Sequence, residues 1–132
     1  MKIKRFSSGV AAGYSFYCPG CEERHVYYTE WDPAYPHHKP TWHFNGNEQA
    51  PTFSPSLLNT GIRHKTMTDA EWVEYDKLVA EKGEKAPLTD PRFRHVCHLF
   101  LNDGVLDFLG DCTHKLAGQK VALPDLPASE GG

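Results

Sequence analysis

The four cysteines are the residues of this sequence best suited to bind a metal ion. Cys18 and Cys21 enclose a Pro-Gly pair, a spacing that lets both sulfurs reach one tetrahedral ion. The competing interpretation is a redox pair, which normally opens a helix. Because the polar residues 22–24 follow without a helical pattern, the spacing favours a metal site.

Two segments around Asp103-Gly104 are predicted to form a β-hairpin. Residues 94–101 and 105–109 alternate apolar with polar side chains, and an Asp-Gly pair accepts the positive φ angles of a type I′ turn. The register set by this turn places five side chains on the core face: Cys97, Leu99, Leu101, Leu106 and Phe108. The opposite face then carries His98, Phe100, Asp107 and Leu109.

Cys97 and Cys112 are predicted to complete the metal site from the far end of the chain. If the second strand continues past Gly110, these cysteines are diagonal neighbours, about 7–8 Å apart at their Cα atoms. One zinc ion is then expected to bind all four thiols: Cys18, Cys21, Cys97 and Cys112. A site closed by four protein ligands is structural rather than catalytic.

The sequence also allows other ligand sets. His114, His98 and His25 are alternatives to Cys112 as the fourth ligand, and iron is an alternative to zinc in the same thiolate cage. Four unrelated buried thiols also account for the cysteines, since a free Cys behaves as a small apolar residue.

Acid–base chemistry is best assigned to the face of the hairpin turned away from the core. The predicted register places His98 and Asp111 there, and His114 follows closely in sequence. A carboxylate beside an imidazole fixes its tautomer and raises its basicity, as a general base requires. The candidate catalytic residues are therefore His98, Asp111 and His114; a purely structural His98–Asp111 hydrogen bond is the alternative.

The elements that position these residues are expected to be short strands, because Pro and Gly are frequent and dispersed. Besides the hairpin, strands are predicted near residues 2–6, 14–17, 25–29, 41–44 and 53–59, with His37 and His38 solvated in a proline-rich loop at 31–40. The predicted fold class is α+β and mainly β. It is a small, zinc-ribbon-like antiparallel sheet domain with one peripheral helix, in a single zinc-stabilised domain spanning 1–132.

The one predicted helix lies within residues 66–91, which we expect to be a helical insertion at the surface. Thr68 and Glu71 form a capping box at its start. An apolar stripe that is expected to pack on the core recurs at helical spacing: Trp72, Tyr75 and Val79.

Composition and charge limit the possible functions. The net charge is -3, whereas binding nucleic acid through a broad basic surface needs clustered Lys and Arg, so no nucleic-acid partner is expected. No apolar run approaches the roughly 18 residues of a membrane span, and no secretory signal is present, so a cytoplasmic protein is expected. The phosphate-loop, dinucleotide, His-Glu-x-x-His and deaminase motifs are all missing.

Five blocks that span most of the chain are distinctive: residues 16–21, 42–47, 51–56, 97–100 and 111–119. In this order they resemble a family of small bacteriophage and prophage proteins that often carries the name ammonia monooxygenase. True ammonia monooxygenases are integral-membrane copper enzymes. This chain has no predicted membrane span, so that name does not describe it. The resemblance therefore implies phage origin and a shared metal-binding fold, without an activity.

From these observations we expect a zinc-binding phage accessory protein in the host cytoplasm. Its polar face is predicted to act as a protein-interaction module that binds a host or phage protein. The alternative is a metal-dependent, hydrolase-type enzyme that uses a site formed by His98, Asp111 and His114. A minor virion or assembly component is the third possibility.

Overall fold

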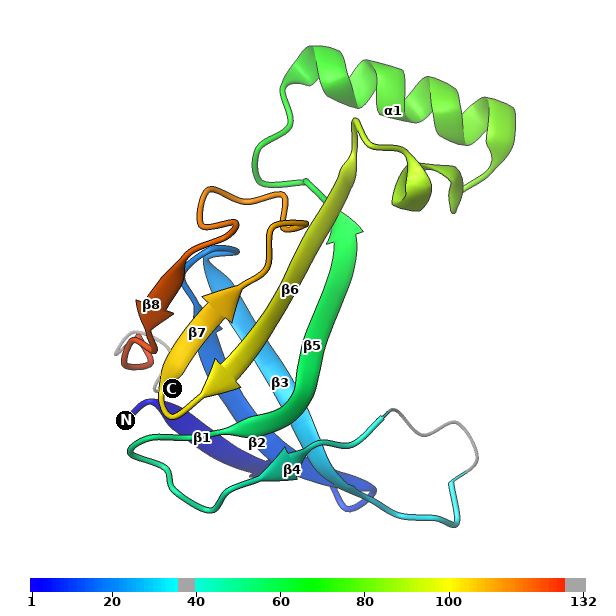
Figure 1. Ribbon diagram of the computed structural model, residues 1–132. Helices are drawn as coiled ribbons and strands as arrows, with labels where there is room; N and C mark the ends of the chain where they lie inside the picture. The colour runs from blue at the N-terminus through cyan, green and yellow to red at the C-terminus, as the bar shows by residue number, and fades with distance from the viewer. Residues whose placement is uncertain (36–39, 128–132) are drawn as a thin grey trace.

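Alternating apolar and polar side chains produce two antiparallel sheets (Figure 1). The structure is a computed structural model that describes residues 1–35 and 40–127. The first sheet has the order β1-β2-β3 and consists of β1 (Ile3–Ser7), β2 (Ala11–Cys18) and β3 (Glu23–Trp31). The second has the order β4-β5-β6-β7-β8 and consists of β4 (His43–Phe44), β5 (Phe53–Ile62), β6 (Arg94–Asn102), β7 (Val105–Phe108) and β8 (Lys120–Ala122).

The predicted hairpin is formed by β6 and β7. Asp103 and Gly104 take positive φ angles of 51° and 75°, and Asn102 lies opposite Val105, as expected of the tight turn. The side chains predicted for the core face of the two strands are all buried: Cys97, Leu99, Leu101, Leu106 and Phe108. The prediction of a mainly β, antiparallel fold with one helix is confirmed.

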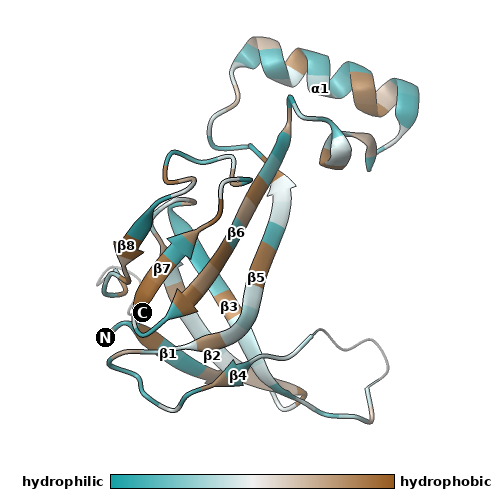
Figure 2. Ribbon diagram, viewed as in Figure 1, coloured by the Kyte–Doolittle hydropathy of each residue, from teal (hydrophilic) through white to brown (hydrophobic). Residues whose placement is uncertain are grey.

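The core lies between the two sheets and is rich in aromatic rings. Tyr27 of β3 stacks on Phe53 of β5 with ring centroids 4.2 Å apart, and Phe16 of β2 stacks on Tyr27 at 5.3 Å. All three rings are fully buried, so they join one sheet to the other. Apolar segments are also visible along β6 and β7 in Figure 2.

The helix α1 (Asp69–Lys82) lies at one end of the sheets, beyond the ends of β5 and β6 (Figure 1). Its predicted capping box is present, since Thr68 accepts from the Glu71 N–H and the Glu71 side chain accepts from the Thr68 N–H. The 3₁₀ helix η1 (Ala86–Thr89) follows it.

The helix is peripheral, as predicted, and its apolar stripe does not reach the core between the two sheets. Trp72, Tyr75 and Val79 are only half-buried, and no residue of α1 is fully buried. The reason is that α1 packs on η1 and on Phe93, whose ring centroid is 5.6 Å from that of Tyr75, instead of covering a sheet. The single-domain assignment stays a prediction.

Strand β8 pairs with β7 and was not predicted, because three residues are too few for a visible alternation. His37 and His38 lie outside the described residues. Within those residues, no helical segment has the length and apolar character of a bilayer span.

Candidate active site and metal centre

Strand β5 departs from regular pairing just before Ser56. Phe53 lies opposite Leu101 and Leu57 opposite Leu99, so β5 contains two more residues than β6 between these pairs. A bulge of this kind re-aims the side chains of the longer strand. Beyond it, Leu57 is buried in the core, and alternation places Ser56 on the opposite face of the sheet.

That face also carries His98, and the three side chains Ser56, His98 and Asp111 form a continuous chain of contacts. The Ser56 Oγ is 3.3 Å from the His98 Nε2, and the His98 Nδ1 is 3.0 Å from the Asp111 Oδ2. A hydroxyl, an imidazole and a carboxylate in this order have the geometry of a nucleophile, its general base and the group that orients the base.

The backbone of Ser56 is held from the side of β4. The Trp42 indole N–H donates to the Ser56 carbonyl at 3.1 Å. The His98 side chain is 26% exposed and that of Asp111 56% exposed, so the triad is open to solvent on the outer face of the sheet. A substrate can therefore reach the Ser56 hydroxyl from outside.

Of the three catalytic candidates, the structure brings His98 and Asp111 together and places His114 elsewhere. The His114 ring packs edge-on against Phe108 with centroids 4.7 Å apart. Ser56 was missed as a nucleophile, although it lies in the distinctive block 51–56. No local nucleophile motif surrounds it, and its approach to His98 depends on the bulge in β5.

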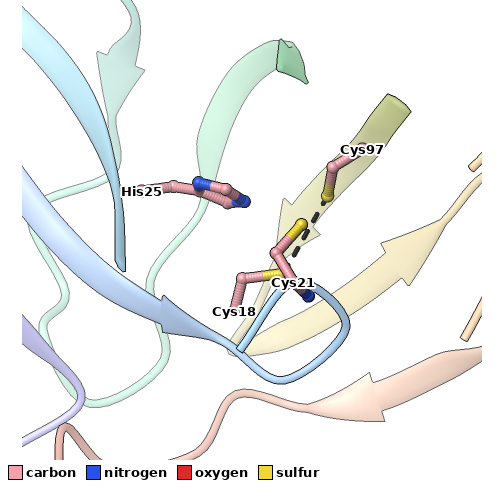
Figure 3. A group of neighbouring side chains, drawn as sticks. All are labelled: Cys18, Cys21, His25 and Cys97. Carbon is pink, nitrogen blue, oxygen red and sulfur yellow. Dashed lines mark hydrogen bonds between the residues drawn. The ribbon is translucent and has the colours of Figure 1, made fainter. Parts of the chain in front are cut away.

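On the other face of the same sheet, four buried side chains could hold a metal ion: Cys18, Cys21, His25 and Cys97 (Figure 3). Their ligand atoms all lie within 4.8 Å of one another. The sulfurs of Cys18 and Cys97 are 3.9 Å apart, and the Cys21 N–H donates to the Cys18 sulfur at 3.4 Å. Amide donation inside a Cys-x-x-Cys turn is the pattern that stabilises a metal-bound thiolate.

The pKa values of the three thiols depend strongly on one another. Hydrogen bonds from Cys21 and from Cys97 hold the pKa of Cys18 far below its usual range, and the interaction with Cys18 raises the pKa values of the other two. One negative charge is thus favoured, and further thiolates repel it. A divalent cation would offset that repulsion and favour the thiolate form of all three cysteines.

His25 fits the same interpretation. Its Nε2 is buried and has no hydrogen-bond partner among the described residues, and its Nδ1 is 2.9 Å from the Asn59 side-chain amide. The Asn59 Nδ2 faces the His25 Nδ1 here; with the Asn59 amide turned by 180°, its oxygen would accept the Nδ1 proton, which leaves the Nε2 lone pair free to bind metal.

Cys112, the predicted fourth thiolate, lies in a second group with Cys97 and His114. Its sulfur accepts from the His98 N–H and its thiol donates to the His98 carbonyl, both at 3.2 Å. The two groups share Cys97. In the structure, His25 therefore takes the place in the Cys18–Cys21 group that the sequence assigned to Cys112, and His25 was among the predicted alternatives.

Two more histidines lie beside the thiols. The His95 Nε2 is 3.0 Å from the Cys21 sulfur, and its Nδ1 is 3.3 Å from the Thr113 Oγ1. Burial lowers the pKa of both His95 and His114, which favours neutral imidazoles. His95 was not among the predicted site residues.

Gly20 has a steric role in the Cys-x-x-Cys turn, since a Cβ there would overlap the His114 ring, with both ring nitrogens 2.6 Å away. We expect Gly20→Ala to lower the free energy of unfolding by about 1–3 kcal/mol, because His114 must move. Thermal denaturation measures the effect. Gly61→Ala is the matched control, because its Cβ meets nothing within 4 Å; equal losses in both variants would contradict this role.

Comparison with known proteins identifies a family that matches most of the chain. The model of a family described as "Bacterial ubiquitination-like system serine protease (BubE)" matches residues 3–109. This segment includes Ser56 and His98 and ends just before Asp111. No curated protein and no solved structure gives a significant match.

Proposed function

Because this chain belongs to the BubE family of bacterial ubiquitination-like system serine proteases, we propose that it is a serine protease with Ser56 as its nucleophile. His98 is the general base and Asp111 orients it. The observation that carries the proposal is the chain of contacts at 3.3 Å and 3.0 Å through these three side chains. The family's name further suggests that the substrate belongs to a ubiquitination-like system.

Two predictions made from the sequence are corrected by the family match. The chain belongs to the BubE family and not to the bacteriophage family that its distinctive blocks resemble. The main functional prediction, an accessory protein acting as an interaction module, is also wrong. The alternative prediction, a hydrolase-type enzyme with a His/Asp site, agrees better with the family. It differs in the nucleophile, which we propose to be a serine hydroxyl instead of a metal-activated water.

The reaction begins with attack of the Ser56 Oγ on the carbonyl carbon of the scissile bond. The His98 Nε2 accepts the hydroxyl proton as the new C–O bond forms, and Asp111 stabilises the resulting imidazolium through the Nδ1–H. His98 then donates this proton to the leaving group as the scissile bond breaks. An ester between the substrate acyl group and Ser56 remains.

Hydrolysis of this ester repeats the same steps with water. His98 removes a proton from a water molecule that attacks the ester carbonyl, and returns the proton to the Ser56 Oγ as the C–O bond breaks. The acid product leaves and the free hydroxyl is restored. Asp111 keeps the Nδ1 protonated in both halves, so that Nε2 is the atom that exchanges protons.

We also propose that Cys18, Cys21, His25 and Cys97 hold a structural zinc ion. Three sulfurs and one imidazole nitrogen match the ligand preferences of zinc, and four protein ligands leave no open position for chemistry. Cys97 precedes His98 on β6, and these neighbours point to opposite faces. The metal site therefore anchors β6 directly beneath the general base.

The assignment of the nucleophile is tested by labelling with a small alkyl fluorophosphonate, which phosphonylates activated serine hydroxyls. We expect one adduct per chain, mapped to Ser56 by mass spectrometry, and none in Ser56→Ala or in His98→Ala, because the hydroxyl needs its base.

Ser54→Ala is the matched control, since Ser54 is an exposed hydroxyl on the same strand. It should retain the full label. An adduct on another residue, or no adduct on folded wild-type protein, contradicts the proposal.

A further inference from the structure

The edge of β5 that follows Ser56 has no neighbouring strand among the described residues. β4 pairs with β5 only at Phe53 and Ser54. Beyond that point, up to Ile62, β5 is paired only on its other edge, with β6. Such an edge presents unpaired main-chain donors and acceptors and can accept another strand.

The main-chain groups of Leu58 point toward this open edge. Leu58 lies opposite His98, whose N–H donates to the Cys112 sulfur and whose carbonyl accepts from the Leu109 N–H. His98 therefore directs its own groups toward β7. In an antiparallel pair of this kind, the opposite residue turns its N–H and C=O to its far edge.

Thr60 follows the same rule. It lies opposite Val96, whose carbonyl accepts from the Thr113 N–H on the β7 side. The direction is the same at Ser56, whose carbonyl accepts from the Trp42 indole on the β4 side. The open edge thus begins directly after the nucleophile and continues through residues 58 and 60 of the same strand.

A cleft of about 300 Å³ lies beside residues 57–59 of this edge, between β5 and β3. Its walls include apolar side chains that are unusually exposed: Val26 is 38% exposed and Leu58 55% exposed. Trp42 also lines the cleft and contacts Ser56 through the hydrogen bond already described. Trp42 therefore links the cleft to the backbone of the nucleophile, and Leu57 and Leu58 of its wall follow Ser56 directly in the chain.

We propose that an extended segment of the substrate polypeptide binds in this cleft as an added β-strand, paired with Leu58 and Thr60. This inference rests on the proposed function, because Ser56 on the same strand is what identifies the occupant as substrate. Strand addition supplies affinity through main-chain hydrogen bonds and specificity through alternate side chains. Apolar side chains of the segment fit the walls formed by Val26 and Leu58.

The test compares two reagents that react with the same hydroxyl, a small alkyl fluorophosphonate and a pool of tripeptidyl diphenyl phosphonates with varied apolar residues. Leu58→Pro removes one donor from the open edge and leaves the pairing with β6 intact. We expect it to slow inactivation by the peptidyl pool about tenfold, the effect of one lost hydrogen bond. Inactivation by the alkyl reagent should change by less than about twofold.

Leu58→Ala is the matched control, because it shortens the side chain and keeps the N–H; its loss of rate should be smaller. A second measurement does not depend on the folding of Leu58→Pro: N-methylated peptidyl phosphonates should inactivate wild-type protein about tenfold more slowly than the parent pool. If the pool and its N-methylated forms react equally fast, the strand-addition proposal is overturned and the serine protease assignment stands. Failure of both reagents to label Ser56 overturns the proposed function itself.

Discussion

Ser56→Ala is expected to reduce the hydrolysis of p-nitrophenyl acetate to the background rate. Loss of the nucleophile from a serine hydrolase triad lowers kcat by about 10⁶-fold, because no acyl-enzyme forms. Asp111→Asn should lower kcat by about 10⁴-fold, since an amide in place of the carboxylate favours the wrong imidazole tautomer. Steady-state kinetics on folded protein measure both effects.

The stability of the same variants separates catalysis from structure. The side chains of His98 and Asp111 are partly open to solvent, so we expect the melting temperature of each variant to stay near that of the wild type. If the His98–Asp111 contact is only structural, Asp111→Asn should instead cost about 1–3 kcal/mol of stability and leave kcat unchanged. Ser54→Ala should match the wild type in both assays.

Removing the metal is expected to unfold the protein. Structural zinc supplies an apparent binding free energy of about 10–16 kcal/mol, comparable to the whole stability of about 5–15 kcal/mol of a typical domain. We therefore expect about one zinc per chain by elemental analysis and loss of the folded circular dichroism spectrum on chelation with dipicolinate. Cys18→Ser should show the same loss without a chelator. Folded protein without metal would contradict this proposal.

The fourth ligand is identified by comparing two variants. His25→Ala removes the ligand that the buried group contains and should release zinc, whereas Cys112→Ala should retain it, because Cys112 lies with Cys97 and His114 in the second group. Metal content after dialysis against a competing chelator distinguishes them. Zinc retained by His25→Ala and lost by Cys112→Ala would establish the all-cysteine set that the spacing predicts.

The hairpin and the capped helix could be predicted because their signals are local. Asp103-Gly104 accepts the positive φ angles of the turn, and once the turn is placed, alternation assigns every side chain of β6 and β7 to a face. The same rule put Cys97 on the core face and His98 on the outer face. The capping box is likewise local, because the side chains of Thr68 and Glu71 each accept a hydrogen bond from the other residue's N–H within one helical turn.

The packing of α1 could not be predicted in this way. An apolar stripe shows that one face of a helix is covered, but it does not show by what. Here the cover is η1 and Phe93, at the end of the sheets, so Trp72 and Tyr75 stay half-buried.

The sequence by itself determined the antiparallel, mainly β fold, the Cys-x-x-Cys turn and the pairing register of the hairpin. Only the tertiary structure decided which hydroxyl meets His98 and which side chain joins the three thiols. Ser56 is 42 residues from His98 along the chain, and its contact with His98 depends on a bulge in β5. No local sequence pattern predicts this bulge. His25 joins the thiols because β3 packs across β5, where Asn59 holds its ring. Both contacts depend on how separate strands pack, and the periodicity within one strand carries no information about its neighbours.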